Sequence, residues 1–160
     1  AMHIHQLCQS YNIPLVINDN VHIAIAIHAD GVHIGQDDMS CLQAREMIGN
    51  DMILGVSCQT VKQALHAQKE GADYLGVGAV FATDTKSDAI EVNHQTLKEI
   101  CQSVSIPVVA IGGINKQNML LLKGTEVDGV ALVSAIFAAK NIQNECEELK
   151  ALSMEMMKHD

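Results

Sequence analysis

The stretch FATDTKSDA, residues 81–89, gathers two threonines, a lysine and two aspartates directly after the apolar, glycine-rich run YLGVGAV. None of these polar side chains helps to build an apolar core. The hydroxyls of Thr83 and Thr85 and the ammonium group of Lys86 are donors suited to a pyrophosphate, and a loop of this kind can act as a lid. The alternative is a solvated surface loop.

Two carboxylates stand at the ends of earlier apolar runs. Asp19 ends IPLVIND, with Asn18 beside it, and Asp38 follows DGVHIG, with Gln36 nearby. Mg²⁺ is held in this way, by one or two carboxylates together with phosphate oxygens of a substrate. In the alternative, each aspartate caps the helix that follows it.

Glycines and a serine end the last two apolar runs, IGGI (111–114) and LVSAI (132–136). Gly112 and Gly113 permit close approach of the backbone, and helix starts after such runs offer free N–H groups to an anion. Loops after the last two strands of a barrel frequently form a phosphate site, so these two segments are candidates for one. The alternative is that the two glycines only make a tight turn.

Six apolar, Val/Ile-rich runs must position these residues: 13–19, 30–35, 52–57, 73–80, 106–113 and 128–134. Continuous rather than alternating runs are typical of parallel strands buried on both faces. Helical patterns lie between them, so the order predicts an α/β fold. Ligands of such folds meet the carboxyl ends of the strands, where the polar residues above fall, as does Ser57.

Two of the intervening segments show helical periodicity. Val61, Ala64, Leu65 and Gln68 form one predicted buried face, which ends before Gly71, and Leu97, Ile100, Cys101 and Val104 form another. An aspartate precedes three of the runs, in ADGVHIG, ADYLGVG and VDGVALVS. We interpret these aspartates as parts of the turns that start the strands.

Length and charge restrict the number of domains and the classes of partner. The 160 residues suit one domain, residues 1–160, and 10 basic against 19 acidic residues give a net charge of −9. That charge argues against a nucleic-acid partner.

The cysteines and the absence of targeting motifs bear on the cellular compartment. Five cysteines without a C-x-x-C pair, and no visible signal peptide or membrane span, predict a cytoplasmic protein. The eight histidines are interpreted as surface or hydrogen-bonded core residues rather than zinc ligands.

The motifs LVINDN, DGVHIGQDDM, LGVSCQT, ADYLGVGAVFATDTKSDA, IPVVAIGGI and DGVALVSAIF closely resemble the thiamine-phosphate synthase family, in order, from about residue 5 to 140. The resemblance implies a TIM-type (β/α)8 barrel. It also implies the joining of hydroxymethylpyrimidine pyrophosphate to a thiazole phosphate, with release of pyrophosphate. Thr85 favours the synthases over the related thiazole tautomerases, which typically lack the second threonine.

The resemblance also implies roles for individual residues. Asp19 and Asp38 would be the Mg²⁺ ligands. The other implied contacts divide by substrate: Asn18, Ser57 and Lys86 toward the pyrophosphate, Gln36 beside the pyrimidine, and Thr83, Thr85, Gly113, Val133 and Ser134 toward the thiazole phosphate. Leaving-group charge would be neutralised by Mg²⁺ and Lys86, with Ser57 assisting, in a dissociative reaction without a strong protein base. Ala82 departs from the family, which usually has proline there.

Only six of the eight expected βα units can be recognised, because the family's first two strands have no counterpart before IPLVIND. We therefore expect an incomplete, N-terminally truncated barrel that self-associates through its open edges and has weak or no synthase activity. Two other functions stay open. The chain could be a different phosphate-binding barrel enzyme, or a non-catalytic remnant that only binds ligand.

Overall fold

A computed structural model describes residues 1–82 and 91–158. Six parallel strands lie in one sheet in the order in which they occur in the sequence. They are β1 (Val16–Asn18), β2 (Gly31–Ile34), β3 (Ile53–Cys58), β4 (Tyr74–Val77), β5 (Val108–Ile111) and β6 (Gly129–Ala131). Each of the six predicted runs thus coincides with a strand, and five of the strands are shorter than their runs; β3 is shifted by one residue relative to the run 52–57.

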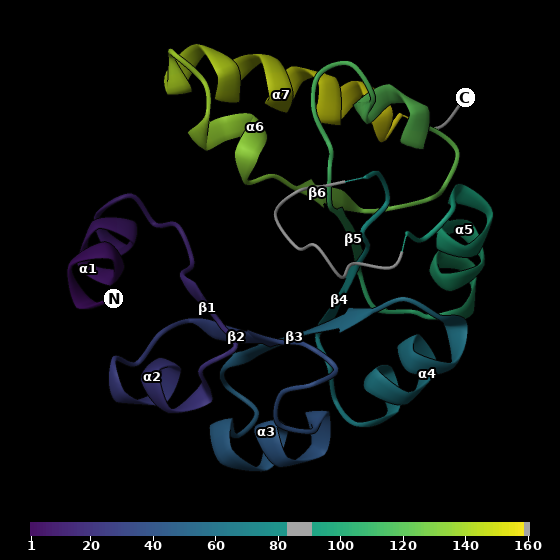
Figure 1. Cartoon of the computed structure of the whole chain (residues 1–160). Coiled ribbons are helices and arrows are strands. Elements are labelled where there is room, and N and C mark those ends of the chain that lie inside the picture. Colours follow the sequence, from purple (N-terminus) through teal and green to yellow (C-terminus); the bar gives the residue numbers. More distant parts are fainter. Residues whose placement is uncertain (83–90, 159–160) are drawn as a thin grey trace.

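The sequential strand order distinguishes a barrel from a doubly wound sheet, in which the order reverses at a switch point. Figure 1 shows the sheet curled into an open arc with the helices on its outer side. β1 and β6 are the two edges, because each pairs with one neighbour only within the sheet. The predicted α/β architecture, an incomplete TIM-type barrel of six strands, is confirmed.

Helices connect the strands, and five of them begin at a side-chain cap. The helices are α1 (Met2–Ser10), α2 (Val21–Ala26), α3 (Cys41–Ile48), α4 (Val61–Lys69), α5 (His94–Ser103), the 3₁₀ helix η1 (Met119–Leu122), α6 (Ser134–Phe137) and α7 (Ile142–Met156). Asn20, Ser40, Thr60, Asn93 and Asn141 each accept a hydrogen bond from an N–H in the first turn of α2, α3, α4, α5 and α7. Such caps satisfy N–H groups that have no partner within the helix.

The core lies between the outer face of the sheet and the helices. Each of the four central strands contributes fully buried residues there, such as Val32 of β2, Leu54 of β3, Leu75 of β4 and Ala110 of β5. The opposite, concave face is less covered, and Ile111 on it is 37% exposed. The prediction that both strand faces are buried is therefore wrong for part of the concave face, because within residues 1–82 and 91–158 the sheet ends at β1 and β6 and stays an open arc.

The predicted buried face of α4 is wrong at Leu65. Leu65 of α4 is 45% exposed, whereas Ala64 and Ala67 are buried against the sheet. Small side chains let α4 approach β3 and β4 closely, and this rotates the buried face away from Leu65. On α5, by contrast, Leu97 and Ile100 are fully buried, as predicted.

The three aspartates that precede strands make the same contact. The Oδ2 atoms of Asp30, Asp73 and Asp128 accept hydrogen bonds from the backbone N–H of Leu15, Leu54 and Val108, at 2.8, 2.7 and 2.8 Å. Each backbone N–H of these aspartates in turn donates to the carbonyl of that same residue. The repeated aspartate therefore joins the start of its own strand to the start of the preceding one.

Arg45 of α3 reinforces one of these junctions. Its Nη2 lies 2.6 Å from Asp73 Oδ2 and 2.7 Å from the carbonyl oxygen of Gly71. The side chain thereby links α3 to the turn that enters β4. Among the described residues, none of the helices is long and apolar enough to cross a membrane.

We predict that Asp128→Ala lowers the free energy of unfolding by about 1 to 2 kcal/mol, because the half-buried Val108 N–H loses its acceptor. Asp128→Asn should recover most of this loss, since an amide oxygen can also accept. Asp51→Ala, in an exposed turn, is the control and should change stability by less than about 0.5 kcal/mol. Urea denaturation measures all three, and equal stability of the Asp128→Ala and Asp51→Ala variants would contradict the role of the junction.

Candidate functional site at the carboxyl rim of the sheet

The predicted site residues in the described part of the chain gather at one rim. Because the six strands are parallel, their carboxyl ends face the same way. The rim carries Asn18, Asp19, Gln36, Asp38, Ser57, Gly113, Val133 and Ser134, which end or directly follow β1, β2, β3, β5 and β6. Thr83, Thr85 and Lys86 lie outside the described residues.

The two carboxylates predicted to bind metal do not cap helices. Asn20, not Asp19, caps α2, and Ser40, not Asp38, caps α3. Asp19 adopts a positive φ of 64°, and its N–H donates to the His33 carbonyl at 2.7 Å. Aspartate tolerates this left-handed conformation better than most residues other than glycine. The alternative interpretation of both aspartates as caps is therefore wrong.

Asp38 folds back over the end of β2. Its Oδ2 accepts a hydrogen bond of 2.7 Å from the Gly35 N–H, which fixes the carboxylate above the strand end. Within residues 1–82 and 91–158, no group of three or more His, Cys, Asp or Glu side chains could hold a metal by itself. Two carboxylates on neighbouring strand ends fit an Mg²⁺ ion only if substrate phosphate completes its coordination.

A hydrogen-bonded chain crosses the concave face beneath the rim. His33 of β2 lies between Tyr74 of β4 and Ser57 of β3: Nδ1 is 2.9 Å from the Tyr74 hydroxyl and Nε2 is 2.9 Å from Ser57 Oγ. Burial raises the pKa of Tyr74, so its hydroxyl stays protonated at neutral pH and can donate to Nδ1. In that tautomer Nε2 donates to Ser57, whose own hydroxyl hydrogen can then point to a ligand.

Glycines make room for this chain. A Cβ atom at Gly76 would lie 2.8 Å from His33 Cε1, and one at Gly55 would collide with both His33 and Tyr74. Neither His33 nor Tyr74 was predicted to be a site residue. The signal lies in the glycines of the runs ILGVSC and YLGV, since glycine inside a strand marks a close approach of another group.

Gln36 ties the β2 end to the β3 end. Its Nε2 donates to the Ser57 carbonyl at 2.7 Å, although the residue is exposed. The same strand end is therefore held on both sides, through its backbone by Gln36 and through its side chain by His33. Ser57 is the best-positioned polar side chain at the rim.

The loop after β5 is shaped around two glycines. Gly112 and Gly113 have φ values of 98° and 66°, in the left-handed region that favours glycine. A Cβ at Gly113 would lie 2.7 Å from the Phe81 carbonyl oxygen, so the start of the threonine-containing loop abuts this one. Asn118 donates to the Gly113 carbonyl at 2.9 Å and holds the turn.

A small pocket opens between the ends of β5 and β6. It is lined by residues 111–114 and 131–134. The two segments were predicted to bind phosphate together, and they lie on opposite sides of one hollow. Backbone N–H groups and the Ser134 hydroxyl are the polar groups available at such a strand-end site.

Lys116, which follows the glycine pair, does not line this pocket and binds carboxylates of α7 instead. Its Nζ donates to Glu148 Oε2 at 2.7 Å and to Glu145 Oε2 at 2.9 Å, both on α7. These hydrogen bonds, first to Glu148 and then to Glu145, raise the pKa of Lys116. The residue fastens α7 to the loop after β5.

Three cysteines, the buried Cys41 and Cys58 and the half-buried Cys101, do not supply a nucleophile. Burial raises the pKa of Cys58 to about 12 and those of Cys41 and Cys101 to about 11. Thiols at these positions stay protonated at neutral pH, and the thiol is a poor nucleophile.

Comparison with known proteins gives consistent matches. The family model described as thiamine monophosphate synthase matches residues 1–136. The thiamine-phosphate synthase of Clostridium tetani is 52% identical over 149 residues, which cover 93% of this chain and 71% of the relative. That of Methanobrevibacter smithii is 54% identical over 149 residues, with the same coverage. The structure of a thiamine phosphate pyrophosphorylase from Pyrococcus furiosus matches with a TM-score of 0.88 and 41% identity, covering 97% of this chain and 74% of that one.

We predict that Gly76→Ala displaces the His33 ring and lowers the free energy of unfolding by about 1 to 3 kcal/mol. Gly129→Ala is the matched control, because a Cβ at that strand position meets no atom within 4 Å. Denaturation curves give the stabilities, and ¹⁵N chemical shifts of His33 report the loss of its two hydrogen bonds. Unchanged His33 shifts in Gly76→Ala would contradict the described packing.

Proposed function

This chain belongs to the thiamine monophosphate synthase family, and we propose that its carboxyl rim binds Mg²⁺-pyrophosphate and thiazole phosphate for the synthesis of thiamine phosphate. The observation that carries the proposal is the convergence of Asp19, Asp38, Ser57 and the Gly112–Gly113 turn on one rim. The chain spans about 70% of the length of its curated relatives.

In the proposed reaction, one C–O bond breaks and one C–N bond forms. The C–O bond between the pyrimidine methylene and pyrophosphate breaks, and pyrophosphate leaves with the electron pair. The thiazole nitrogen then donates its lone pair to the methylene carbon, so that a C–N bond forms and the ring becomes a thiazolium. No proton has to be removed by a protein base, which suits a rim whose groups stabilise negative charge.

Each residue then has a role in holding charge. Asp19 and Asp38 would hold Mg²⁺, which when bound neutralises the leaving pyrophosphate. Asn18, the hydroxyl of Ser57 and the ammonium group of Lys86 would donate to that same group, and Gln36 would flank the pyrimidine. The remaining donors, Thr83, Thr85, Gly113, Val133 and Ser134, would surround the thiazole phosphate.

His33 acts in this scheme as a positioning residue. It touches Ser57 through Nε2 and Tyr74 through Nδ1, each at 2.9 Å. Both ring nitrogens are thereby engaged with protein groups, which makes His33 a poor general base. An isomerase or epimerase on the same fold would need such a base, and this observation favours the transferase.

Two further properties belong to the proposal. All five cysteines are free thiols, which fits a reducing, cytoplasmic environment. The substrates are small molecules, and the acidic net charge of −9 offers nothing to a nucleic acid.

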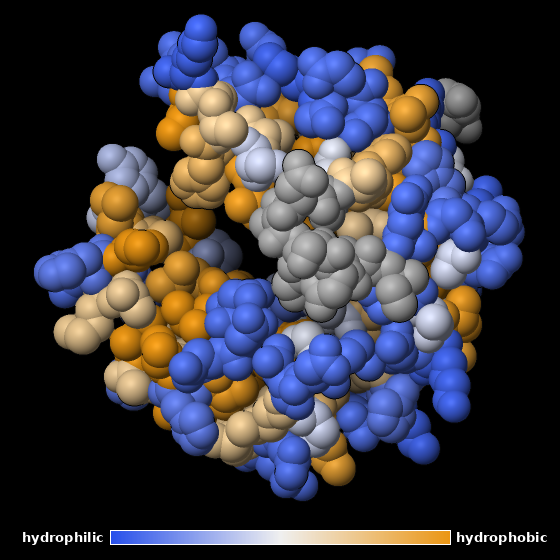
Figure 2. Space-filling view, viewed as in Figure 1, coloured by the Kyte–Doolittle hydropathy of each residue, from blue (hydrophilic) through white to orange (hydrophobic). Residues whose placement is uncertain are grey.

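We also propose that the chain self-associates by pairing its open edges. β1 and β6 are edge strands, and unpaired strand edges are templates for association. Figure 2 shows apolar residues beside the hollow on the left of the view, in the region of α1 and α2 in Figure 1. Large apolar side chains are exposed on α1, in the segment after it and on α6: Met2, Ile4, Leu7, Tyr11, Ile13 and Phe137. A second copy would cover both the edges and this surface.

The function is tested by measuring thiamine phosphate formed from both substrates with Mg²⁺. We expect slow product formation, because the concave face is open where a closed barrel would surround the pyrimidine. Asp38→Ala should abolish it and also remove Mg²⁺-dependent pyrophosphate binding in calorimetry, whereas Asp37→Ala, one residue away and exposed, should retain both. Pyrophosphate binding without product would identify a ligand-binding remnant, and loss of neither property in Asp38→Ala would refute the metal assignment.

Self-association is tested by light scattering on the eluting protein. We expect about twice the 17.3 kDa chain mass. Leu7→Glu on α1 should shift the chain toward the monomer, because it places a charge on the exposed apolar surface. Leu65→Glu, also an exposed leucine but on the outer helix α4, should leave the mass unchanged. A monomeric wild-type chain would overturn this proposal.

A further inference from the structure

Two successive carbonyl groups in the turn after β5 are held by other parts of the protein. The carbonyl of Gly112 accepts a hydrogen bond of 3.2 Å from the Phe81 N–H, in the segment that follows β4. The carbonyl of Gly113 accepts two hydrogen bonds from side-chain amides, one of 2.9 Å from Asn118 Nδ2 and one of 3.2 Å from Asn115 Nδ2. Both asparagines belong to the loop that leads from this turn to η1.

The Asn118 side chain is fixed at both ends of its amide group. Its Oδ1 accepts a hydrogen bond of 2.8 Å from the Asn115 N–H, while its Nδ2 donates to the Gly113 carbonyl. A backbone N–H can only donate and a carbonyl can only accept, so the two contacts define which end of the amide faces which partner. Asn118 therefore cannot rotate without losing both hydrogen bonds.

The held carbonyls determine where the next two N–H groups point. A trans peptide is planar, and its C=O and N–H point in opposite directions. The N–H groups of Gly113 and Ile114 are therefore directed away from the partners of the two carbonyls. Within residues 1–82 and 91–158, neither of these N–H groups donates a hydrogen bond. Successive backbone N–H groups of this kind form concavities that bind anions.

These N–H groups belong to residues that line the small pocket between the ends of β5 and β6. Gly113 and Ile114 lie on its β5 side, and residues 132–134 lie across from them. The two strands are neighbours in the sheet (Figure 1). Among the described residues, none that lines this pocket carries a charged side chain. The direction of the backbone N–H groups therefore matters for how well the pocket holds an anion.

We propose that Asn118 is a positioning residue for phosphate binding: by holding the Gly113 carbonyl, it directs the Ile114 N–H toward a phosphate ester in this pocket. Asn118 does not itself line the pocket, so it acts through the peptide between Gly113 and Ile114. Asn115 supports the same carbonyl through the longer of the two bonds. The inference rests on the function proposed above, in which this pocket takes the thiazole phosphate.

Asn118→Asp separates the two hydrogen bonds of the side chain. A carboxylate can still accept from the Asn115 N–H, but it has no donor for the Gly113 carbonyl and repels that oxygen. The Gly113–Ile114 peptide should then turn away from its present direction. We expect the thiazole phosphate to bind at least about tenfold more weakly, because a hydrogen bond to a charged group is lost.

Two further variants complete the series. Asn115→Asp removes only the 3.2 Å bond to the Gly113 carbonyl, and its carboxylate can still accept from the Gln117 N–H as Oδ1 does now at 2.9 Å. It should weaken binding less than Asn118→Asp does. Asn144→Asp introduces the same charge at an exposed position of α7 outside the pocket. This matched control should bind like the wild-type chain.

Binding is measured by titrating the ¹⁵N-labelled chain with the thiazole phosphate and following the amide signals. In the wild-type chain the Ile114 signal should shift saturably, as expected for an N–H that gains a phosphate acceptor. The corresponding thiazole alcohol, which lacks the phosphate, should not move this signal. In Asn118→Asp the Ile114 shift should be lost, while the signals of β1 to β3 overlay those of the wild-type chain and show that the fold is intact.

The possible outcomes separate this inference from the function on which it rests. A wild-type chain that does not bind the thiazole phosphate would overturn both the proposed phosphate site and the positioning role. Binding by the wild-type chain, with equal affinity and the same Ile114 shift in Asn118→Asp, would overturn the positioning role alone. If Asn118→Asp does not fold, Asn115→Asp decides, and affinity equal to that of Asn144→Asp would refute the role of the held carbonyl.

Discussion

The common direction of six hydrogen-bonded strands is the constraint on which this structure depends. Parallel pairing in sequential order forces every carboxyl end onto one rim and every amino end onto the other. The two rims then do different work. Asp30, Asp73 and Asp128 join neighbouring strands at the amino ends, and residues that we propose to bind ligand, such as Asp38, lie at the opposite rim.

Two glycines shape the concave face, because their missing side chains leave space for a neighbouring ring. Strand glycines are unfavourable by themselves, because they lose more backbone entropy on folding than other residues. Here Gly55 and Gly76 leave space for the His33 ring, which bridges Tyr74 and Ser57. A hydrogen-bonded chain inside a barrel is strong only if every member has a partner. Among the described side chains, no buried nitrogen or oxygen lacks a hydrogen bond.

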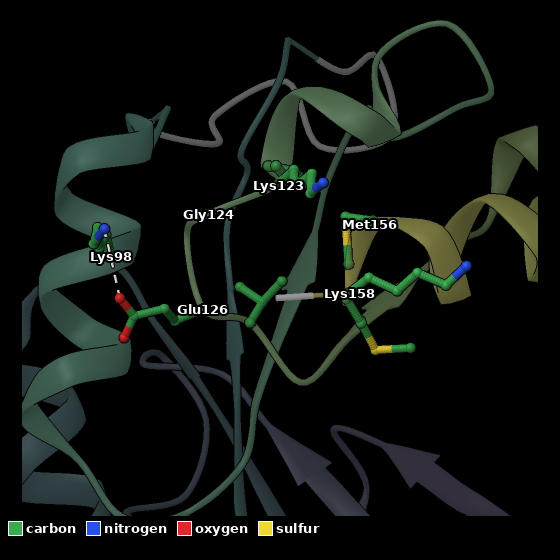
Figure 3. A pocket seen from close by; sticks show the side chains of 9 residues that line it. Lys98, Lys123, Gly124, Glu126, Met156 and Lys158 are labelled. Atoms are coloured by element: carbon green, nitrogen blue, oxygen red, sulfur yellow. Dashed lines mark ion pairs between the residues drawn. The ribbon is translucent and has the colours of Figure 1, made fainter. Parts of the chain in front are cut away.

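The two sides of the molecule offer different surfaces. On the side of α1, apolar side chains lie exposed beside the edge strand β1. On the side of α5, the outer helices cover the sheet, and a pocket whose lining includes the buried Leu122, Val127 and Met156 lies at the end of α7 (Figure 3). The first surface is suited to another polypeptide, because it combines an unpaired strand edge with exposed apolar side chains.

The sequence by itself determined the strands, their order along the chain and the family. Continuous Val/Ile runs and strand-end motifs depend on local composition, which the chain carries wherever it folds. Tertiary structure decided which face of α4 is buried, since the small side chains of Ala64 and Ala67 rather than the larger Leu65 meet the sheet. It also decided that Asn20 and Ser40, not Asp19 and Asp38, cap helices. The two caps are local contacts, each between residues three apart. The burial of α4 against the sheet and the meeting of His33 with Ser57 and Tyr74 join residues far apart in the chain, and no local pattern encodes such distances.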